Sequence, residues 1–132
     1  MKTHHSLIAW QQARTVTKSV IELSITSWKP QFAAIFGQLQ RSSLSVQINI
    51  AEGYAFTDSG HLRNHLRIAY ASAIETDDLL DLMGDYEQFK KAEVAEALSA
   101  CRESQKLLFG LMKRYGALRT PSQAGGRRSP IV

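Results

Sequence analysis

Apolar residues recur along most of the chain at alternating intervals of four and three positions. This spacing places them on one side of an α-helix, and it predicts amphipathic helices over about 6–26, 59–83 and 92–115. A further helix, the second in chain order, is predicted over about 32–52. It is more apolar than the other three, and we expect it to end at Gly53. The three prolines, at positions 30, 121 and 130, lie outside these segments, and strand patterns are nearly absent.

Four helices of this length, joined by short links, predict an all-α fold: an antiparallel up-down-up-down four-helix bundle. We place the bundle in residues 1–116. Over 117–132, glycine, proline and arginine replace the apolar pattern, so we expect a disordered basic tail there. A chain of 132 residues accommodates one such domain.

The composition favours a cytoplasmic protein without membrane association. No stretch reaches the ~18 consecutive apolar residues of a membrane span, and the first residues run directly into an amphipathic segment rather than into the apolar core of a signal sequence. Cys101 is the only cysteine, so the chain cannot form an internal disulfide or a thiolate metal site.

The helix predicted over 32–52 is unusual because it is apolar on two sides. At 100° per residue, one apolar side faces the bundle core, and the opposite side presents Leu44, Ile48 and Ala51. A helix that is apolar on two sides is usually buried on both. We therefore predict that these three residues contact another copy of the chain, in a closed ring or a dimer. The alternative is a loosely covered surface.

A polar stripe separates the two apolar sides of this helix. Arg41 and Glu52 lie roughly 16 Å apart along the helix axis, too far to pair with each other. Each polar side chain must therefore find water, another helix or another subunit. The stripe is interpreted as a solvated or hydrogen-bonded face, with a ligand site as the alternative. Its members are Gln38, Arg41, Ser42, Ser45, Asn49 and Glu52.

Residues 38–53 resemble the signature helix of the four-helix-bundle proteins encoded in intervening sequences of bacterial 23S rRNA genes. The most specific part of the match is Asn49-Ile50-Ala51-Glu52-Gly53. Two further strings match, Trp10-Gln11-x-Ala13 and Ile68-Ala69-x-Ala71-Ser72-x-x-Glu75. The chain departs from the family pattern at Gln47, where proline is usual, and at Gln40, where a second basic residue is usual.

The resemblance implies an all-α bundle that often assembles as a ring-shaped homopentamer and whose biochemical role is uncertain. A related accessory protein of diversity-generating retroelements is similar in bundle and pentamer, and it binds a reverse transcriptase and nucleic acid. By this resemblance, the expected partners are further copies of the chain and a nucleic acid or a nucleic-acid enzyme. Nothing in the chain indicates a component of the ribosome.

The charges predict where a nucleic acid would bind. In an up-down bundle, the first and third helices start at the end where the second and fourth finish. That end collects basic residues, and the opposite end collects acidic ones. In a ring of parallel subunits the basic ends would form one face that attracts anions. The predicted contacts are Arg63, Arg67, Lys113 and Arg114.

Several carboxylate and histidine patterns permit an enzymatic interpretation. Asp77-Asp78-x-x-Asp81 has the form of an aspartate-rich magnesium motif. Glu75-x-x-Asp78 and Glu93-x-x-Glu96 resemble, in reversed order, the carboxylate pairs of all-α nucleotide pyrophosphohydrolases. His61 and His65 have the spacing of a metal-binding pair. We interpret these groups as solvated acidic faces and exposed histidines, and we predict no catalytic residue, cofactor or metal.

Two inner positions of the last helix are polar. Cys101 is expected to be a small core residue. Gln105 predicts a buried hydrogen-bonded pair or a site facing an interface, without identifying the partner.

These observations together predict a non-enzymatic, homo-oligomeric helical scaffold. The alternative is a small Mg²⁺-dependent all-α nucleotide pyrophosphohydrolase.

Overall fold

The computed structural model of the chain describes residues 4–55 and 59–118. It contains four α-helices, α1 (Ile8–Thr26), α2 (Ala33–Ala55), α3 (Ser59–Met83) and α4 (Lys91–Arg114), and two short 3₁₀ turns, η1 (His4–Ser6) and η2 (Pro30–Phe32). These two ranges contain no strand. The predicted all-α class is therefore confirmed.

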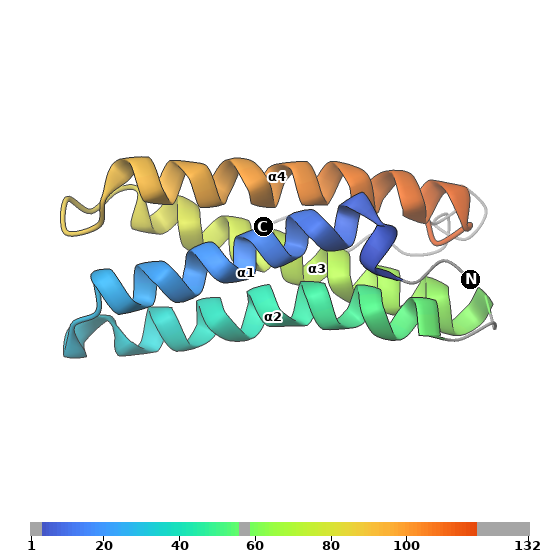
Figure 1. Cartoon of the computed structure of the whole chain (residues 1–132), viewed down its shortest axis with the longest axis horizontal. Coiled ribbons are helices and arrows are strands. Elements are labelled where there is room, and N and C mark those ends of the chain that lie inside the picture. The colour runs from blue at the N-terminus through green and yellow to red at the C-terminus, as the bar shows by residue number, and fades with distance from the viewer. Residues whose placement is uncertain (1–3, 56–58, 119–132) are drawn as a thin grey trace, which may run out of the picture.

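The four helices form an antiparallel up-down-up-down bundle (Figure 1). Each helix packs against two neighbours: α1 and α3 both lie between α2 and α4. Within the described ranges, the backbones of the diagonal pairs α1–α3 and α2–α4 do not approach closely, since none of their Cα atoms lie within 8 Å of each other. Because neighbouring helices are antiparallel, α1 and α3 start at the end of the bundle where α2 and α4 finish.

The core consists of two apolar clusters separated by a layer of hydroxyl groups. One cluster surrounds Leu66 and Leu108, and the other surrounds Phe36 and Leu80. Two hydroxyl groups of the layer form hydrogen bonds to a neighbouring helix. Thr17 donates to the carbonyl of Ser43 at 3.2 Å, and Thr76 donates to Ser42 Oγ at 2.8 Å. Such pairing offsets the cost of burying polar groups. The buried polar residues of the layer are Thr17, Ser42, Ser43, Thr76 and Ser104, and among them Ser104 Oγ has no hydrogen-bond partner within the described residues.

The expected end of α2 at Gly53 is wrong, since the helix continues to Ala55. Gly53 is buried, and a Cβ at this position would lie 3.0 Å from His65 Cβ and 3.3 Å from Leu62 Cδ1. The glycine therefore serves the close approach of α2 to α3 rather than helix termination.

The expected start of the tail at residue 117 also needs correction. Gly116 has φ +72°, the left-handed conformation that commonly follows a helix end. The next residue, Ala117, is 3% exposed and packs in the core cluster around Leu66 and Leu108. Its N–H donates to the carbonyl of Met112 at 2.7 Å. The packed bundle thus includes Ala117, and residues 119–132 of the predicted tail lie outside the described residues.

Across 4–55 and 59–118, none of the helices combines the length and the apolar character that crossing a bilayer requires.

Candidate functional site

The predicted polar stripe of α2 lies along its contact with α3. Gln38 Nε2 donates to Glu75 Oε2 at 2.9 Å, and Gln38 Oε1 accepts from Arg41 Nη1 at 2.9 Å. One level further along, the hydroxyls of Ser45 and Ser72 lie 2.8 Å apart. We call this set of residues, Gln38, Arg41, Ser45, Asn49 and Glu52 with their partners on α3, the polar seam.

At the end of the polar seam, Asn49 and Glu52 surround His65. Asn49 Nδ2 donates to the carbonyl of Ser45 at 2.8 Å and to Ser45 Oγ at 3.1 Å. Since a carbonyl only accepts, the amide nitrogen must face Ser45, and Asn49 Oδ1 must face His65 Nδ1 at 2.9 Å. Oδ1 is an acceptor, so this network assigns a proton to Nδ1 of His65. Glu52 Oε2 lies 3.7 Å from the same nitrogen.

These contacts agree with the interpretation of the stripe as a hydrogen-bonded helix face. The partners of the stripe on α3, which the sequence alone did not identify, are His65, Ser72 and Glu75. These three residues recur at intervals of seven and three, the spacing of one helix side, so a polar stripe on α3 could have been read as the counterpart of the stripe on α2.

The predicted interface residues of α2 differ in how far they are exposed. Leu44 and Ile48 lie on the outside of the bundle, with 41% and 47% of their surface exposed. Ala51 is half-buried and packs against the core, so the structure does not place it in the same exposed row. Ile68 of α3, 41% exposed, extends the row. Ile48 and Ile68 both lie about one turn from the Ser45–Ser72 contact, toward the same end. We call Leu44, Ile48 and Ile68 the α2–α3 apolar surface.

The four predicted basic contacts gather at one end of the bundle. Arg63 and Arg67 lie near the start of α3, and Lys113 and Arg114 end α4; these two termini meet at the same end (Figure 1). Arg67 Nε donates to the carbonyl of Ala117 at 2.9 Å. Lys113 and Arg114 are exposed, and the Arg114 guanidinium lies 5.5 Å from the centre of the Tyr115 ring. Arg67 is exposed as well, whereas Arg63 is half-buried.

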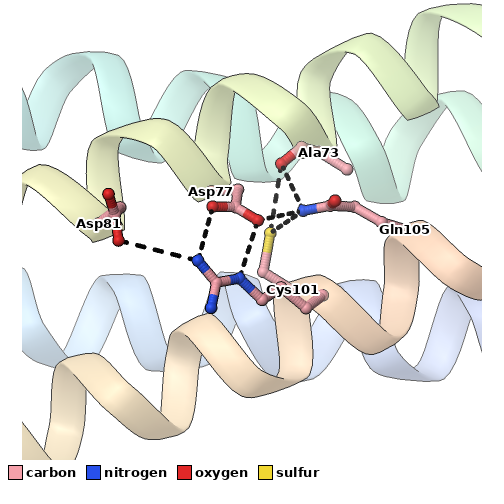
Figure 2. Close-up of polar contacts among 6 residues, drawn as sticks. Ala73, Asp77, Asp81, Cys101 and Gln105 are labelled. Atoms are coloured by element: carbon pink, nitrogen blue, oxygen red, sulfur yellow. Dashed lines mark hydrogen bonds and ion pairs between the residues drawn. The ribbon is translucent and has the colours of Figure 1, made fainter.

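Figure 2 shows the partner of Gln105, which the sequence left open. Gln105 Nε2 donates to Asp77 Oδ2 at 2.7 Å. Asp77 also accepts from Arg102, whose Nε and Nη2 lie 3.2 and 3.4 Å from its two oxygens. Arg102 Nη2 lies 3.8 Å from Asp81 Oδ1 as well. Asp77 and Asp81 of the aspartate-rich motif are therefore bridged by a guanidinium that links α3 to α4.

Cys101 lies beside this network but faces the core. The thiol donates to the carbonyl of Ala73 at 3.3 Å, and only 2% of the residue is exposed. Burial raises the pKa of Cys101 to about 11, so the thiolate that a nucleophile or a metal ligand requires is scarce near neutral pH. Cys101 is a core residue.

One carboxylate of each of the other two pairs has a partner within the chain. Glu75 accepts from Gln38, and Glu93 lies 3.8 Å from Lys90 Nζ. In the part of the chain that the structure describes, no group of three or more histidine, cysteine, aspartate or glutamate side chains is arranged to hold a metal ion.

The fold and the seam define the class: a compact up-down bundle of four α-helices, with its polar signature residues between α2 and α3. The model of the family described as "23S rRNA-intervening sequence protein" matches residues 5–110. The chain therefore belongs to this family, and the resemblance seen in its second helix is confirmed.

A solved structure with the same fold is that of a protein with unknown function from the S23 ribosomal protein family of Bacteroides thetaiotaomicron. It is similar to this chain with a TM-score of 0.57 and 23% sequence identity, over 77% of this chain and 98% of that one. At this level of identity the likeness establishes the fold. Among curated proteins, none matches the chain.

Proposed function

We propose that the protein is a non-catalytic cytoplasmic scaffold that assembles from copies of itself into a ring of five and presents its basic ends to a nucleic acid or a nucleic-acid enzyme. The observation that carries the proposal is the exposure of Leu44 and Ile48 on the outside of α2. Removing such apolar surface from water favours association. The number five comes from the family resemblance.

The placement of the charged residues supports the second half of the proposal. Lys113 and Arg114 end α4 and are exposed at the same end as Arg63 and Arg67. In a ring of parallel subunits these ends would form one face, and the summed field would attract a polyanion. We assign this face the contact with nucleic acid.

The engagement of the carboxylates favours a scaffold over the competing pyrophosphohydrolase. Such an enzyme needs carboxylates that are free to bind Mg²⁺. Asp77 instead accepts three hydrogen bonds from Arg102 and Gln105. The cost of breaking these bonds would oppose Mg²⁺ binding at Asp77.

The mass of the protein in solution tests self-association. Size-exclusion chromatography with light scattering should give about five times the 14.7 kDa of one chain. Because association follows mass action, the measurement is repeated over a series of dilutions. A mass of one chain at every concentration would overturn the proposal.

A further inference from the structure

A groove with two aromatic side chains lies between α3 and α4. Phe109 is 44% exposed, and its ring centre lies 6.1 Å from that of Tyr70. These two aromatic side chains line a groove together with Arg102, Lys106, Asp77 and Gln105. We call it the α3–α4 groove. It lies on the side of the bundle next to the α2–α3 apolar surface, because α3 packs between α2 and α4.

Adjacent positions of the two surfaces favour a closed assembly. When one surface of a molecule binds a different surface of the next copy, the contact repeats with the same rotation each time. Surfaces on opposite sides would build an open filament. When the two surfaces are on neighbouring sides, each copy is rotated relative to the previous one, so the series of contacts can close into a ring.

The two surfaces also lie at matching heights along the bundle. Rotation about a ring axis that is parallel to the helices does not change the height of any residue along the bundle. Residues of two copies that contact each other must therefore lie at equal heights. Ser45 and Ser72 are at one height, since their hydroxyls lie 2.8 Å apart. From there, Ile48 is about 4.5 Å and Tyr70 about 3 Å toward the basic end. Phe109 packs on Tyr70, so Ile48 and Phe109 lie within one helical turn of each other in height.

Opposite charges flank the two surfaces on the same side. Glu75 lies five residues beyond Tyr70 along α3, toward the acidic end of the bundle, and is exposed. Lys106 precedes Phe109 by three residues on α4, which is also toward the acidic end, and lines the groove. A contact between the two surfaces would therefore bring the Glu75 carboxylate near the Lys106 ammonium, which favours one register of the two copies.

We infer that the α2–α3 apolar surface of one copy binds the α3–α4 groove of the next copy, with Leu44, Ile48 and Ile68 against Tyr70 and Phe109 and with Glu75 beside Lys106. The inference rests on the proposed ring, which already requires contacts between two different surfaces, and it adds which two surfaces meet and in which register.

Cross-linking between copies tests this pairing. Ile48→Cys and Phe109→Cys are placed in separate chains with different affinity tags, co-expressed, and treated with a short bismaleimide. We expect cross-linked dimers that carry both tags, and none from either variant alone. Wild-type protein controls for the buried Cys101 thiol. Leu82→Cys, at a residue 46% exposed, replaces Ile48→Cys as the matched control and should give no product with Phe109→Cys.

The outcomes separate the two proposals. Cross-links within Ile48→Cys alone, in a protein that is oligomeric by light scattering, would overturn the head-to-tail pairing and the ring of five, and would leave only self-association intact. A monomeric mass would overturn both. The double variant Ile48→Cys/Phe109→Cys provides a further check, because head-to-tail copies linked in sequence give a ladder that ends at the number of subunits in the ring. A single dimer band would contradict the pairing.

Discussion

Asn49 Oδ1 lies 2.9 Å from Nδ1 of His65, and this contact joins the signature helix α2 to the start of α3. The amide of Asn49 is itself oriented by the carbonyl and the hydroxyl of Ser45. The asparagine therefore fixes both the approach of the two helices and the protonated nitrogen of the imidazole. Gly53 makes this contact possible, because a side chain there would meet Cβ of His65 at 3.0 Å.

Replacing Asn49 should destabilise the bundle. Asn49→Ala removes the hydrogen bonds to Ser45 and the contact between Asn49 Oδ1 and the half-buried His65. We therefore expect a loss of about 1–3 kcal/mol in the free energy of unfolding. Urea denaturation followed by circular dichroism measures this loss. Gln47→Ala, a half-buried glutamine on the same helix, is the control and should change stability by less than half as much. Equal effects of the two variants would contradict the role of Asn49.

Alanine substitutions at two glycines of α2 should change stability in opposite directions. At Gly53, the new Cβ would lie 3.0 Å from His65 Cβ and 3.3 Å from Leu62 Cδ1, so Gly53→Ala should cost about 1–3 kcal/mol through forced separation of α2 and α3. At Gly37 the Cβ would meet nothing within 4 Å, so Gly37→Ala should stabilise the helix by up to about 1 kcal/mol.

Thermal or urea unfolding of the two glycine variants provides the comparison. Both substitutions add the same methyl group to α2, so the difference in stability between the variants reports mainly the packing at Gly53. A Gly53→Ala protein as stable as Gly37→Ala would show that α2 and α3 do not approach as closely as the structure places them.

A charge on the α2–α3 apolar surface should dissociate the proposed assembly. Leu44→Glu or Ile48→Glu would place a carboxylate in the contact between copies, where its desolvation is costly. We expect the mass measured by light scattering to fall to that of one chain, while the helical signal at 222 nm stays unchanged. Leu82→Glu is the control, since Leu82 is exposed to a similar extent, at 46%. Loss of helicity along with mass would place Leu44 and Ile48 in the core instead.

Removing positive charge at the basic end should weaken nucleic-acid binding. The double variant Lys113→Ala/Arg114→Ala deletes two exposed cations, and if both contact phosphates, the slope of log affinity against log salt should fall by about 1–2. Electrophoretic mobility shifts with RNA and with DNA, from about 50 mM salt upward, measure the slope. Lys90→Ala/Lys91→Ala, at the opposite end, is the charge-matched control. Equal slopes for all three proteins would exclude the basic end as the binding face.

The helices, their order and the basic end could be predicted because they depend on periodicity, which is local information. A 4,3 pattern is enough to orient a helix toward a core, and short links are enough to make neighbours antiparallel. The polar stripe from Gln38 to Glu52 was identified in the same way. Its meaning was not, because the partners Glu75, Ser72 and His65 lie 37, 27 and 16 residues away along the chain.

By itself, then, the sequence determined an all-α bundle, its family and the side of each helix that is buried, since these follow from residue types at helical spacing. The tertiary structure alone decided that Gly53 is a point of helix contact rather than a helix end, that Asp77 is the partner of Gln105, and that Ala51 and Ala117 pack inward. Each of these depends on which residues of another helix come within a few ångströms, and that distance is set by the packing of all four helices together.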